Sequence, residues 1–496
     1  MKSSLITWFF VSALAGASLI GAVPTAISAD VGSPRLNLPD FGSSADTLLS
    51  SGEERRLGQA FMHSVRRALP VIEDPLLSDY VAGFGQRLVA ASGHRGRHFH
   101  FFLIDDPLVN AFAGPHGYIG IYAGLVLAAE TESELAAVIA HEIAHVTQRH
   151  LMRAIEDARK MSLPATALLI GAAILGARVS PDAGTAAMAG IQAATIQRQI
   201  SFTRENEKEA DRIGIATLAD AGHDPFAMAG FFDRLAKGSR IHETNAPEML
   251  RTHPVTTSRI ADAVARAEAF GHRQRPDSLR FHLVRANLRE RGYRRPEQAV
   301  EHFRATLREG RYANETAERY GYALALARHG QIDAARKQIA PLLASHPQQA
   351  EFLILDAELA RRAGNTDRAL TSLREAVGLS PSSLPLRMAY AEALLEAGQG
   401  RSALRQLEPL AQGQEAGPAL FALLVTAAAR AQDQGATYRY RAEQHYARGD
   451  IDAAIRQLEA AVRQRDLAYH EAARLQARLD ELNDENEAIK QDPWNR

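Results

Sequence analysis

The 496-residue sequence contains no cysteine. This absence excludes disulfide bonds, thiolate metal sites and cysteine nucleophiles, so any metal ion must be held by histidine and carboxylate side chains. The sequence also lacks an excess of charge of either sign. Its formal net charge is -1 and no segment is strongly basic, which argues against nucleic-acid binding. With 46% hydrophobic and 23% charged residues, the chain is typical of a folded protein with two or three domains.

The first residues carry almost no charge. Lys2 is the single basic residue before an uncharged, apolar stretch at 5–23, and small residues precede Asp30. This pattern predicts an export signal at 1–29 that is cleaved near Asp30. The alternative is a retained membrane anchor, but the stretch is short for a bilayer span and glycine and proline interrupt its end. No cysteine follows the stretch, so lipid attachment at a cysteine is excluded.

An HExxH sequence lies inside an apolar segment in the middle of the amino-terminal half. Its histidines, His141 and His145, are four residues apart, so on a helix both imidazoles leave the same face and can bind one metal ion. Glu142 then lies beside the open coordination position, where a carboxylate can take a proton from water. The pattern predicts hydrolytic metal chemistry. The alternative is that two histidines and a glutamate occur by chance in a core helix.

The surrounding segment is predicted to be helical independently of this motif. The sequence from Thr131 to Glu134 predicts a capping box, in which the glutamate returns to the backbone of the capping residue. Apolar residues then recur at helical spacing: Leu135, Val138, Ile139 and Val146. The pattern predicts a buried or half-buried helix.

A third ligand is expected from the acidic stretch at 201–214. On a helix, Glu207 shares a face with Asp211 and small or apolar residues, whereas Glu205 and Glu209 share a face with basic residues. Glu207 is therefore the predicted ligand, and Glu205 and Glu209 are predicted to face solvent. Asp211, one turn on, could accept the free ring N–H of a ligating histidine.

These motifs resemble peptidase family M48. The HExxH helix is followed by a Thr-Arg-Glu-Asn-Glu-Lys-Glu-Ala-Asp run at 203–211, although Thr203 stands where serine is more usual. The segments at 110–115 and 117–119 resemble the strand-forming region before the active helix of that family. The resemblance implies a zinc endopeptidase with one Zn²⁺ per chain, bound by His141, His145 and Glu207, with Glu142 as the base.

The resemblance also implies that His253, in a Thr-His-Pro sequence, lies near the zinc. It could occupy the open fourth position as a plug or donate a hydrogen bond to the developing oxyanion, and we favour the plug. From residue type alone, His253 could instead simply cap a turn before Pro254.

For partners, the resemblance to repeat-bearing M48 peptidases implies a periplasmic protein whose substrates are misfolded or stalled outer-membrane β-barrel proteins. The repeats would dock the β-barrel assembly machinery, and chaperone-like activity would accompany proteolysis. The rival interpretation is a non-catalytic repeat scaffold or chaperone with a structural or vestigial zinc site.

Those repeats are visible as a 34-residue period after about residue 270. Glycines, alanines and prolines each recur at this interval: Gly330, Gly364 and Gly398; Ala335, Ala369 and Ala403; Pro347 and Pro381. This is the tetratricopeptide period, in which glycine closes a turn between two helices and alanine permits close packing. Gly292 with Ala299 resembles a degenerate first unit, and Gly449 a displaced last unit. An alanine-rich helical bundle would not explain the exact spacing.

An apolar excursion separates the two ligand-bearing helices. Residues 161–177 carry no charge and are followed by a run of small residues to about 195. A membrane hairpin is disfavoured, because the run is short and contains Pro164. We predict a lid over the cleft or a loop that makes peripheral membrane contact through 161–195.

The predicted fold is a mainly α domain with a small β-sheet (α+β), zincin-like, followed by an all-α tetratricopeptide-repeat solenoid. The expected divisions are a signal peptide at 1–29, an extended arm at 30–52, the metallopeptidase domain at 53–265, the repeat domain at 275–485 and a loose tail at 486–496. Strands are expected at 98–105 and 118–122. A peptide substrate could add itself to an exposed edge of their sheet.

Overall fold

The structure is a computed structural model that describes residues 50–94, 97–160, 204–241, 247–413, 416–464 and 467–491. The predicted signal at 1–29, the arm as far as residue 49 and the apolar excursion at 161–195 lie outside these ranges. Within the ranges, every helix is too short or too polar to cross a membrane.

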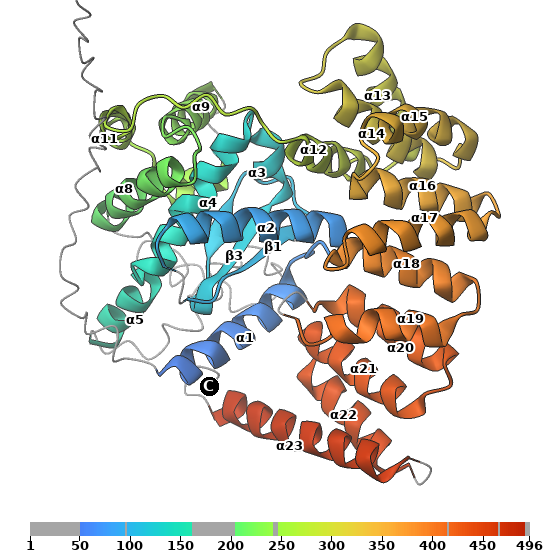
Figure 1. Ribbon diagram of the computed structural model, residues 1–496. Helices are drawn as coiled ribbons and strands as arrows, with labels where there is room; N and C mark the ends of the chain where they lie inside the picture. The colour runs from blue at the N-terminus through green and yellow to red at the C-terminus, as the bar shows by residue number, and fades with distance from the viewer. Residues whose placement is uncertain are drawn as a thin grey trace, which may run out of the picture. The chain divides into compact units, whose positions relative to one another are not determined.

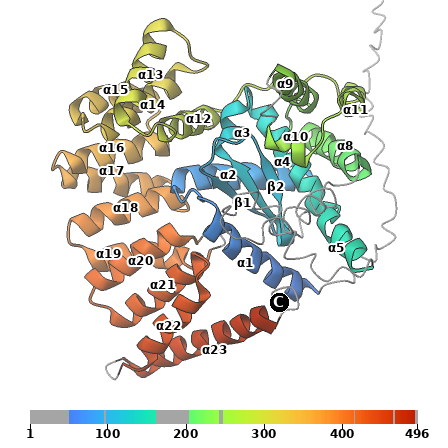
Figure 2. The ribbon, with the colours of Figure 1, turned by 180° about the vertical axis from the view of Figure 1, so that it is seen from behind.

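The amino-terminal domain consists of helices arranged around a small sheet (Figures 1 and 2). Its elements are α1 (Ser51–Ala68), α2 (Pro75–Ala91), β1 (His100–Ile104), β2 (Ala111–Ala113), η2 (Pro115–Gly117), β3 (Tyr118–Tyr122), α3 (Ala123–Ala128), α4 (Glu132–Thr147), α5 (His150–Lys160), α8 (Arg204–Asp220), α9 (Ala227–Ile241), α10 (Glu248–Thr252) and α11 (Thr257–Glu268).

The sheet has the strand order β1-β3-β2. β1 pairs with β3 in parallel, His100 opposite Tyr118, and β2 pairs with β3 antiparallel, Ala111 opposite Ile121. Alternate residues of β1 pack on opposite faces, as a pleated strand requires: Leu103 belongs to the core shared with α2 and α4, and Phe102 to the core shared with α1. The sheet is therefore buried on both faces, and β2 forms one edge.

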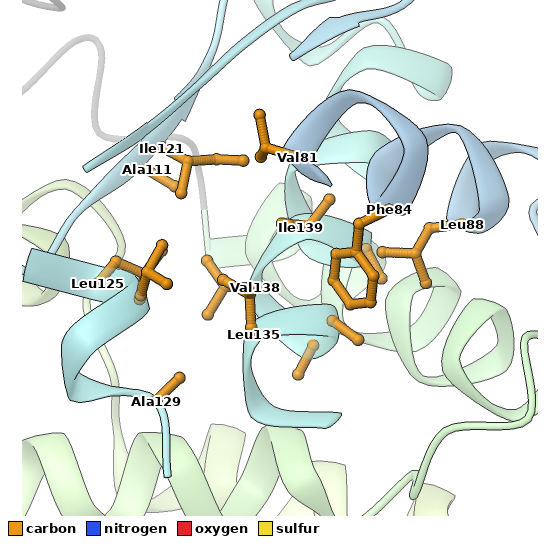
Figure 3. Close-up of a cluster of buried hydrophobic side chains, with 14 of the residues drawn as sticks. Val81, Phe84, Leu88, Ala111, Ile121, Leu125, Ala129, Leu135, Val138 and Ile139 are labelled. Carbon is orange, nitrogen blue, oxygen red and sulfur yellow. The ribbon is translucent and has the colours of Figure 1, made fainter. Parts of the chain in front are cut away.

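α4 is the central helix of the larger core. Leu135, Val138 and Ile139 are at most 1% exposed and pack in one cluster with Phe84 and Leu88 of α2. Figure 3 shows these side chains together with others from α3, β2 and β3. The predicted buried helix is confirmed, and its apolar faces fix its position against the rest of the domain.

The start of α4 is capped differently from the predicted capping box. Thr131 accepts a hydrogen bond from the backbone N–H of Glu134, as predicted. The Glu134 carboxylate, however, accepts from the backbone N–H of Glu130 and pairs with Arg234 of α9. The prediction of a capping box is wrong for the Glu134 side chain, because Arg234 binds its carboxylate.

α8 crosses α4 in close contact. A Cβ atom on Gly214 would lie 3.2 Å from the backbone nitrogen of His141 and 2.9 Å from the terminal methyl of Met228. Only glycine fits here without displacing a neighbour. The acidic face of α8 is thereby held against the HExxH turn of α4.

The repeat domain is all helical. Its elements are α12 (Leu279–Arg291), α13 (Pro296–Glu309), α14 (Glu315–Arg328), α15 (Ile332–Ser345), α16 (Ala350–Arg362), α17 (Thr366–Leu379), α18 (Leu384–Glu396), α19 (Gly400–Leu407), η3 (Glu408–Leu410), α20 (Pro418–Arg430), α21 (Gln434–Ala447), α22 (Ile451–Val462) and α23 (Tyr469–Gln491).

The periodic residues have the roles expected of them. Gly330, Gly364 and Gly398 have φ values of 83°, 79° and 73°, so each ends a helix in the left-handed conformation that favours glycine. The periodic alanines at 335, 369 and 403 are fully buried in the hairpin cores. Gly292 differs, with φ of -63° at the end of α12, which fits its description as part of a degenerate unit.

The two domains share a core at α12. Phe281, Val284 and Leu288 of α12 belong to the same hydrophobic cluster as α2, α4 and the sheet. Ser278, the N-cap of α12, donates through its hydroxyl to the buried carboxylate of Glu132, at the start of α4. The first repeat helix is thus packed on α2 and α3, and its N-cap is hydrogen-bonded to the start of the helix that carries the HExxH sequence.

At the carboxyl end, α23 continues to Gln491. The prediction of a loose tail from residue 486 is therefore wrong for residues up to 491. Leu475, Leu479 and Leu482 of α23 pack on α22 in the last hydrophobic cluster of the repeat domain. This contact makes α23 the helix that caps the repeat domain.

Candidate metal centre

The centre begins with two histidines on one face of α4. His141 and His145 are four residues apart, so their rings leave the helix in the same direction. Their Nε2 atoms are 2.9 Å apart, and both side chains are buried. Burial lowers the pKa of His145 well below its ordinary value, which leaves a neutral ring with a lone pair available for a cation.

α8 places a carboxylate against both rings. The Oε2 atom of Glu207 lies 3.5 Å from Nε2 of His141, and its Oε1 atom lies 3.5 Å from Nε2 of His145. Glu207 is only 2% exposed, whereas Glu205 points away into solvent. The structure thus brings together the three residues that the sequence singles out as ligands.

His253 lies in the same cluster. It directly follows α10, and its Nδ1 atom lies 3.1 Å from Oε1 of Glu207 and 3.3 Å from Nε2 of His141. One donor atom from each of His141, His145, Glu207 and His253 lies within 4.8 Å of the others. Among the described residues, this is the one group of histidines and carboxylates close enough to hold a metal ion.

Asp211 and Arg259 support the cluster from behind. The Oδ1 atom of Asp211 lies 3.0 Å from Nδ1 of His141. Arg259 of α11 donates to both oxygens of Asp211 at 2.8 Å and contacts Oε2 of Glu207 at 2.8 Å. Burial opposes a charge on His141, but its hydrogen bonds to Asp211 and Glu207 outweigh that effect and raise its pKa to about 10. The site therefore favours a cation among these groups.

Glu142 is a buried carboxylate beside the cluster. It is 1% exposed, and neither carboxylate oxygen meets hydrogen-bond geometry with a described residue. The carboxylate faces Nε2 of His253, 3.5 Å away, and the backbone of Ala113 in β2. Burial raises the pKa of Glu142. A carboxylate that is costly to keep ionised is well suited to accept a proton.

The donor set fits a divalent cation. The carboxylates of Glu142, Glu207 and Asp211 carry three negative charges when ionised, and Arg259 carries one positive charge. This leaves -2 when the histidines are neutral, which metal binding through their Nε2 atoms requires. Imidazole nitrogens with a carboxylate oxygen, and no thiolate, form a typical ligand set of hydrolytic metal sites. The unpartnered oxygens of Glu142 point to a ligand or water bound beside the cluster.

Comparisons with known proteins agree with this geometry. The model of peptidase family M48 matches residues 75–267, and a tetratricopeptide-repeat model matches residues 360–425. A beta-barrel assembly-enhancing protease of Escherichia coli (strain K12) is 36% identical over 482 residues, which cover 97% of each chain. The chain belongs to peptidase family M48.

Other M48-like relatives match parts of the chain. A putative beta-barrel assembly-enhancing protease of Vibrio cholerae is 41% identical over 320 residues, or 64% of this chain and 66% of that protein. A mitochondrial metalloendopeptidase, OMA1 of Arabidopsis thaliana, is 31% identical over 166 residues, or 33% of this chain and 31% of that protein. The M48 peptidase is thus a metallopeptidase joined to tetratricopeptide repeats, and the predicted fold class is confirmed.

Two residues at the M48 centre, Arg259 and His150, were missed by the sequence analysis, and a third, Glu209, was placed wrongly in part. Arg259 belongs to an ordinary amphipathic helix, and nothing in its spacing points to Asp211, 48 positions earlier. His150 lies 2.8 Å from His145 and 3.2 Å from Glu209. The prediction that Glu209 faces solvent is therefore wrong in part, because its side chain is 31% exposed and contacts this buried histidine. The acidic run on α8 could be recognised in the sequence, but nothing in the sequence indicated its partner on α5, His150.

Proposed function

We propose that this M48 peptidase is an exported, zinc-dependent endopeptidase that acts in the assembly and quality control of outer-membrane β-barrel proteins. The observation that carries the proposal is the buried cluster of His141, His145 and Glu207 with the Glu142 carboxylate beside it. Support for the biological setting comes from a relative named for β-barrel assembly that matches this chain over 97% of both lengths.

Zinc is the proposed metal, with one ion per chain. His141, His145 and Glu207 would hold it, which is the ligand pattern of catalytic zinc sites that keep one position open. Zinc, when bound, supplies a Lewis acid that polarises a peptide carbonyl and lowers the pKa of a water molecule. Asp211 and Arg259 hold His141 and Glu207 in place through the contacts described above.

Glu142 would perform the proton transfers. As a base, it accepts a proton from the attacking water and then passes that proton to the amine of the leaving peptide. Its position beside Ala113 places it next to β2, an edge strand of the sheet. An extended peptide that adds to this edge would bring its backbone past the carboxylate without regard to sequence.

The repeats would bind the β-barrel assembly machinery, and misfolded or stalled outer-membrane proteins would be the substrates. A chaperone-like activity would accompany proteolysis, because repeats can hold unfolded chains without cleaving them. A purely non-catalytic scaffold is disfavoured, because burial of the Glu142 carboxylate raises its pKa and costs stability, and a scaffold does not need this residue.

Substrate capture tests this proposal. A full-length Glu142→Gln variant, crosslinked in cells and purified, should enrich outer-membrane β-barrel proteins over a Glu205→Gln control, whereas both variants should recover subunits of the assembly machinery through their repeats. The same recovery of β-barrel proteins from both variants, or enrichment of unrelated soluble proteins alone, would reject the proposed substrate class.

Export is a separate part of the proposal. The mature protein should begin within a few residues of Asp30 and should be released with the periplasmic fraction. Intact mass measurement of the purified protein checks the cleavage site. An intact Met1 in the membrane pellet would show that the segment is an anchor.

His253 is proposed to plug the centre. Its Nδ1 atom approaches the same donor atoms that would surround the metal, so an imidazole here competes with substrate for the open position. The basal rate then scales with the fraction of open molecules. His253→Ala should raise basal casein cleavage about tenfold if roughly one molecule in ten is open.

Zinc content, measured in parallel, separates the two roles of His253. A plug predicts higher basal cleavage, whereas an oxyanion donor predicts slower turnover with zinc retained. Unchanged cleavage and unchanged zinc affinity would exclude both roles and leave His253 as a turn residue.

A further inference from the structure

His145, the second histidine of the HExxH sequence, contacts another histidine, His150, on the side away from the proposed metal. The Nε2 atoms of His141 and His145 face each other and Glu207, so these are the atoms available to a metal. Their Nδ1 atoms therefore point outward. Nδ1 of His141 reaches the carboxylate of Asp211, but Nδ1 of His145 reaches Nδ1 of His150, 2.8 Å away.

If His145 binds a metal through Nε2, this contact fixes the positions of the ring protons on both histidines. If Nε2 of His145 keeps its lone pair for a metal, the ring proton is on Nδ1 and must be donated. Nδ1 of His150 then has to accept, so His150 carries its own proton on Nε2. That atom lies 3.2 Å from Oε2 of Glu209. Each ring nitrogen of His145 and His150 thus has one role, and the Glu209 carboxylate is the final acceptor.

The backbone is shaped to make this contact. Residues five apart on a continuous helix lie about 140° apart around the axis, so His150 could not reach His145 if α4 simply continued. The helix is broken instead at Arg149, whose φ of 54° is the left-handed conformation that non-glycine residues rarely adopt. α5 then begins at His150, which is 0% exposed.

Three carboxylates of α8 contact the histidines of the centre. Glu207 faces the metal-ligand atoms, Asp211 lies behind His141, and Glu209 lies behind His150. Glu209 also lies 3.5 Å from Arg153 of α5, which helps to fix its side chain. Asp211 thus contacts His141 directly, whereas Glu209 acts on His145 through the neutral imidazole of His150.

We propose that His150, oriented by Glu209, is a positioning residue that fixes the tautomer and ring orientation of His145 for metal binding. This inference rests on the proposed zinc site. Partners of this kind typically contribute 10- to 100-fold to metal affinity. Loss of the acceptor at His150 leaves the Nδ1–H of His145 buried and without this hydrogen bond, which frees the ring to rotate or to adopt the other tautomer.

A matched pair of substitutions isolates the hydrogen bond. The side-chain oxygen of asparagine stands where Nδ1 of histidine stands, so His150→Asn keeps an acceptor for His145. His150→Leu has a comparable volume and no acceptor. Both are made in the full-length Glu142→Gln protein, so that self-cleavage does not interfere, and zinc affinity is measured by competition with a chromogenic chelator.

We expect His150→Leu to lower zinc affinity about 10- to 100-fold and His150→Asn to restore most of that loss. Equal loss in both variants would show a packing role only and would overturn the proposal, as would affinity within twofold of the parent in His150→Leu. Failure of the parent protein to bind zinc would instead reject the proposed metal site itself.

Glu209 provides a test that does not disturb the core. Glu209→Ala removes a half-buried side chain, and Glu205→Ala removes an exposed one from the same helix. We expect about a threefold to tenfold loss of zinc affinity for Glu209→Ala and less than twofold for Glu205→Ala. If His150→Leu does not fold, equal affinities in these two variants overturn the proposal.

Discussion

Glu142→Gln is expected to lower kcat/KM for peptide cleavage by about 10³-fold or more while zinc stays bound. General bases contribute roughly 10²- to 10⁴-fold to such reactions, and here one residue both accepts and returns the proton. Glutamine has nearly the same shape as glutamate but cannot accept the proton. The measurement is cleavage of a casein-type substrate, with zinc content determined on the same preparation.

The stability of the Glu142→Gln protein provides an internal control. Burial raises the pKa of the Glu142 carboxyl, so the native site resists the charge that catalysis requires. A neutral amide avoids that cost, and the variant should be at least as stable as the parent in thermal unfolding. Full activity of the Glu142→Gln protein would show that Glu142 is not the base. Loss of activity together with unfolding of this protein would contradict the expected stability.

Much of this M48 fold could be predicted from sequence because its signals are local. The capping threonine at 131 and the helical spacing of apolar residues identified α4, and the 34-residue glycine spacing identified the repeat hairpins. In both cases the deciding interactions lie within one helix or one hairpin. The structure adds the positions of these elements, above all the shared core between α12 and the amino-terminal domain.

The residues of the centre that could not be predicted from the sequence depend on contacts between distant segments. Arg259 reaches Asp211 and Glu207 only because α11 packs beside α8, and no periodicity in either helix indicates this. His150 was missed for a different reason. The break at Arg149 has no glycine or proline, so the sequence does not show that α4 ends there.

These contacts also explain why an arginine can be buried in a metal centre. Arg259 is 4% exposed and contacts two carboxylates, whose combined charge exceeds its own. It also donates to the backbone oxygen of Pro254 at 2.8 Å. The loop that carries His253 is therefore attached to the same guanidinium that holds Glu207 and Asp211. Movement of the proposed plug must break or rearrange this hydrogen bond, so the position of the plug and the geometry of the ligands are coupled.

Glu207→Gln is expected to lower zinc affinity by more than about 100-fold, which exceeds the usual effect of residues that only support a ligand. The carboxylate lies within 3.5 Å of both histidine Nε2 atoms, so its removal takes a negative charge away from the atoms that would bind the metal. Glutamine keeps the length of the side chain and can still accept from Arg259, so the fold should be retained. Chelator competition measures the loss, and thermal unfolding in excess chelator checks the fold.

The three glutamates of α8 make this prediction selective. Glu205→Gln should bind zinc within twofold of the parent, because its side chain is exposed and points away from the centre. Glu209→Gln should lie between the two, since it acts on His145 only through His150 and its amide oxygen can still accept a hydrogen bond. Equal losses in all three would mean that the charge of α8 as a whole attracts the metal. A ranked series would instead show that zinc affinity depends on which atom each carboxylate contacts.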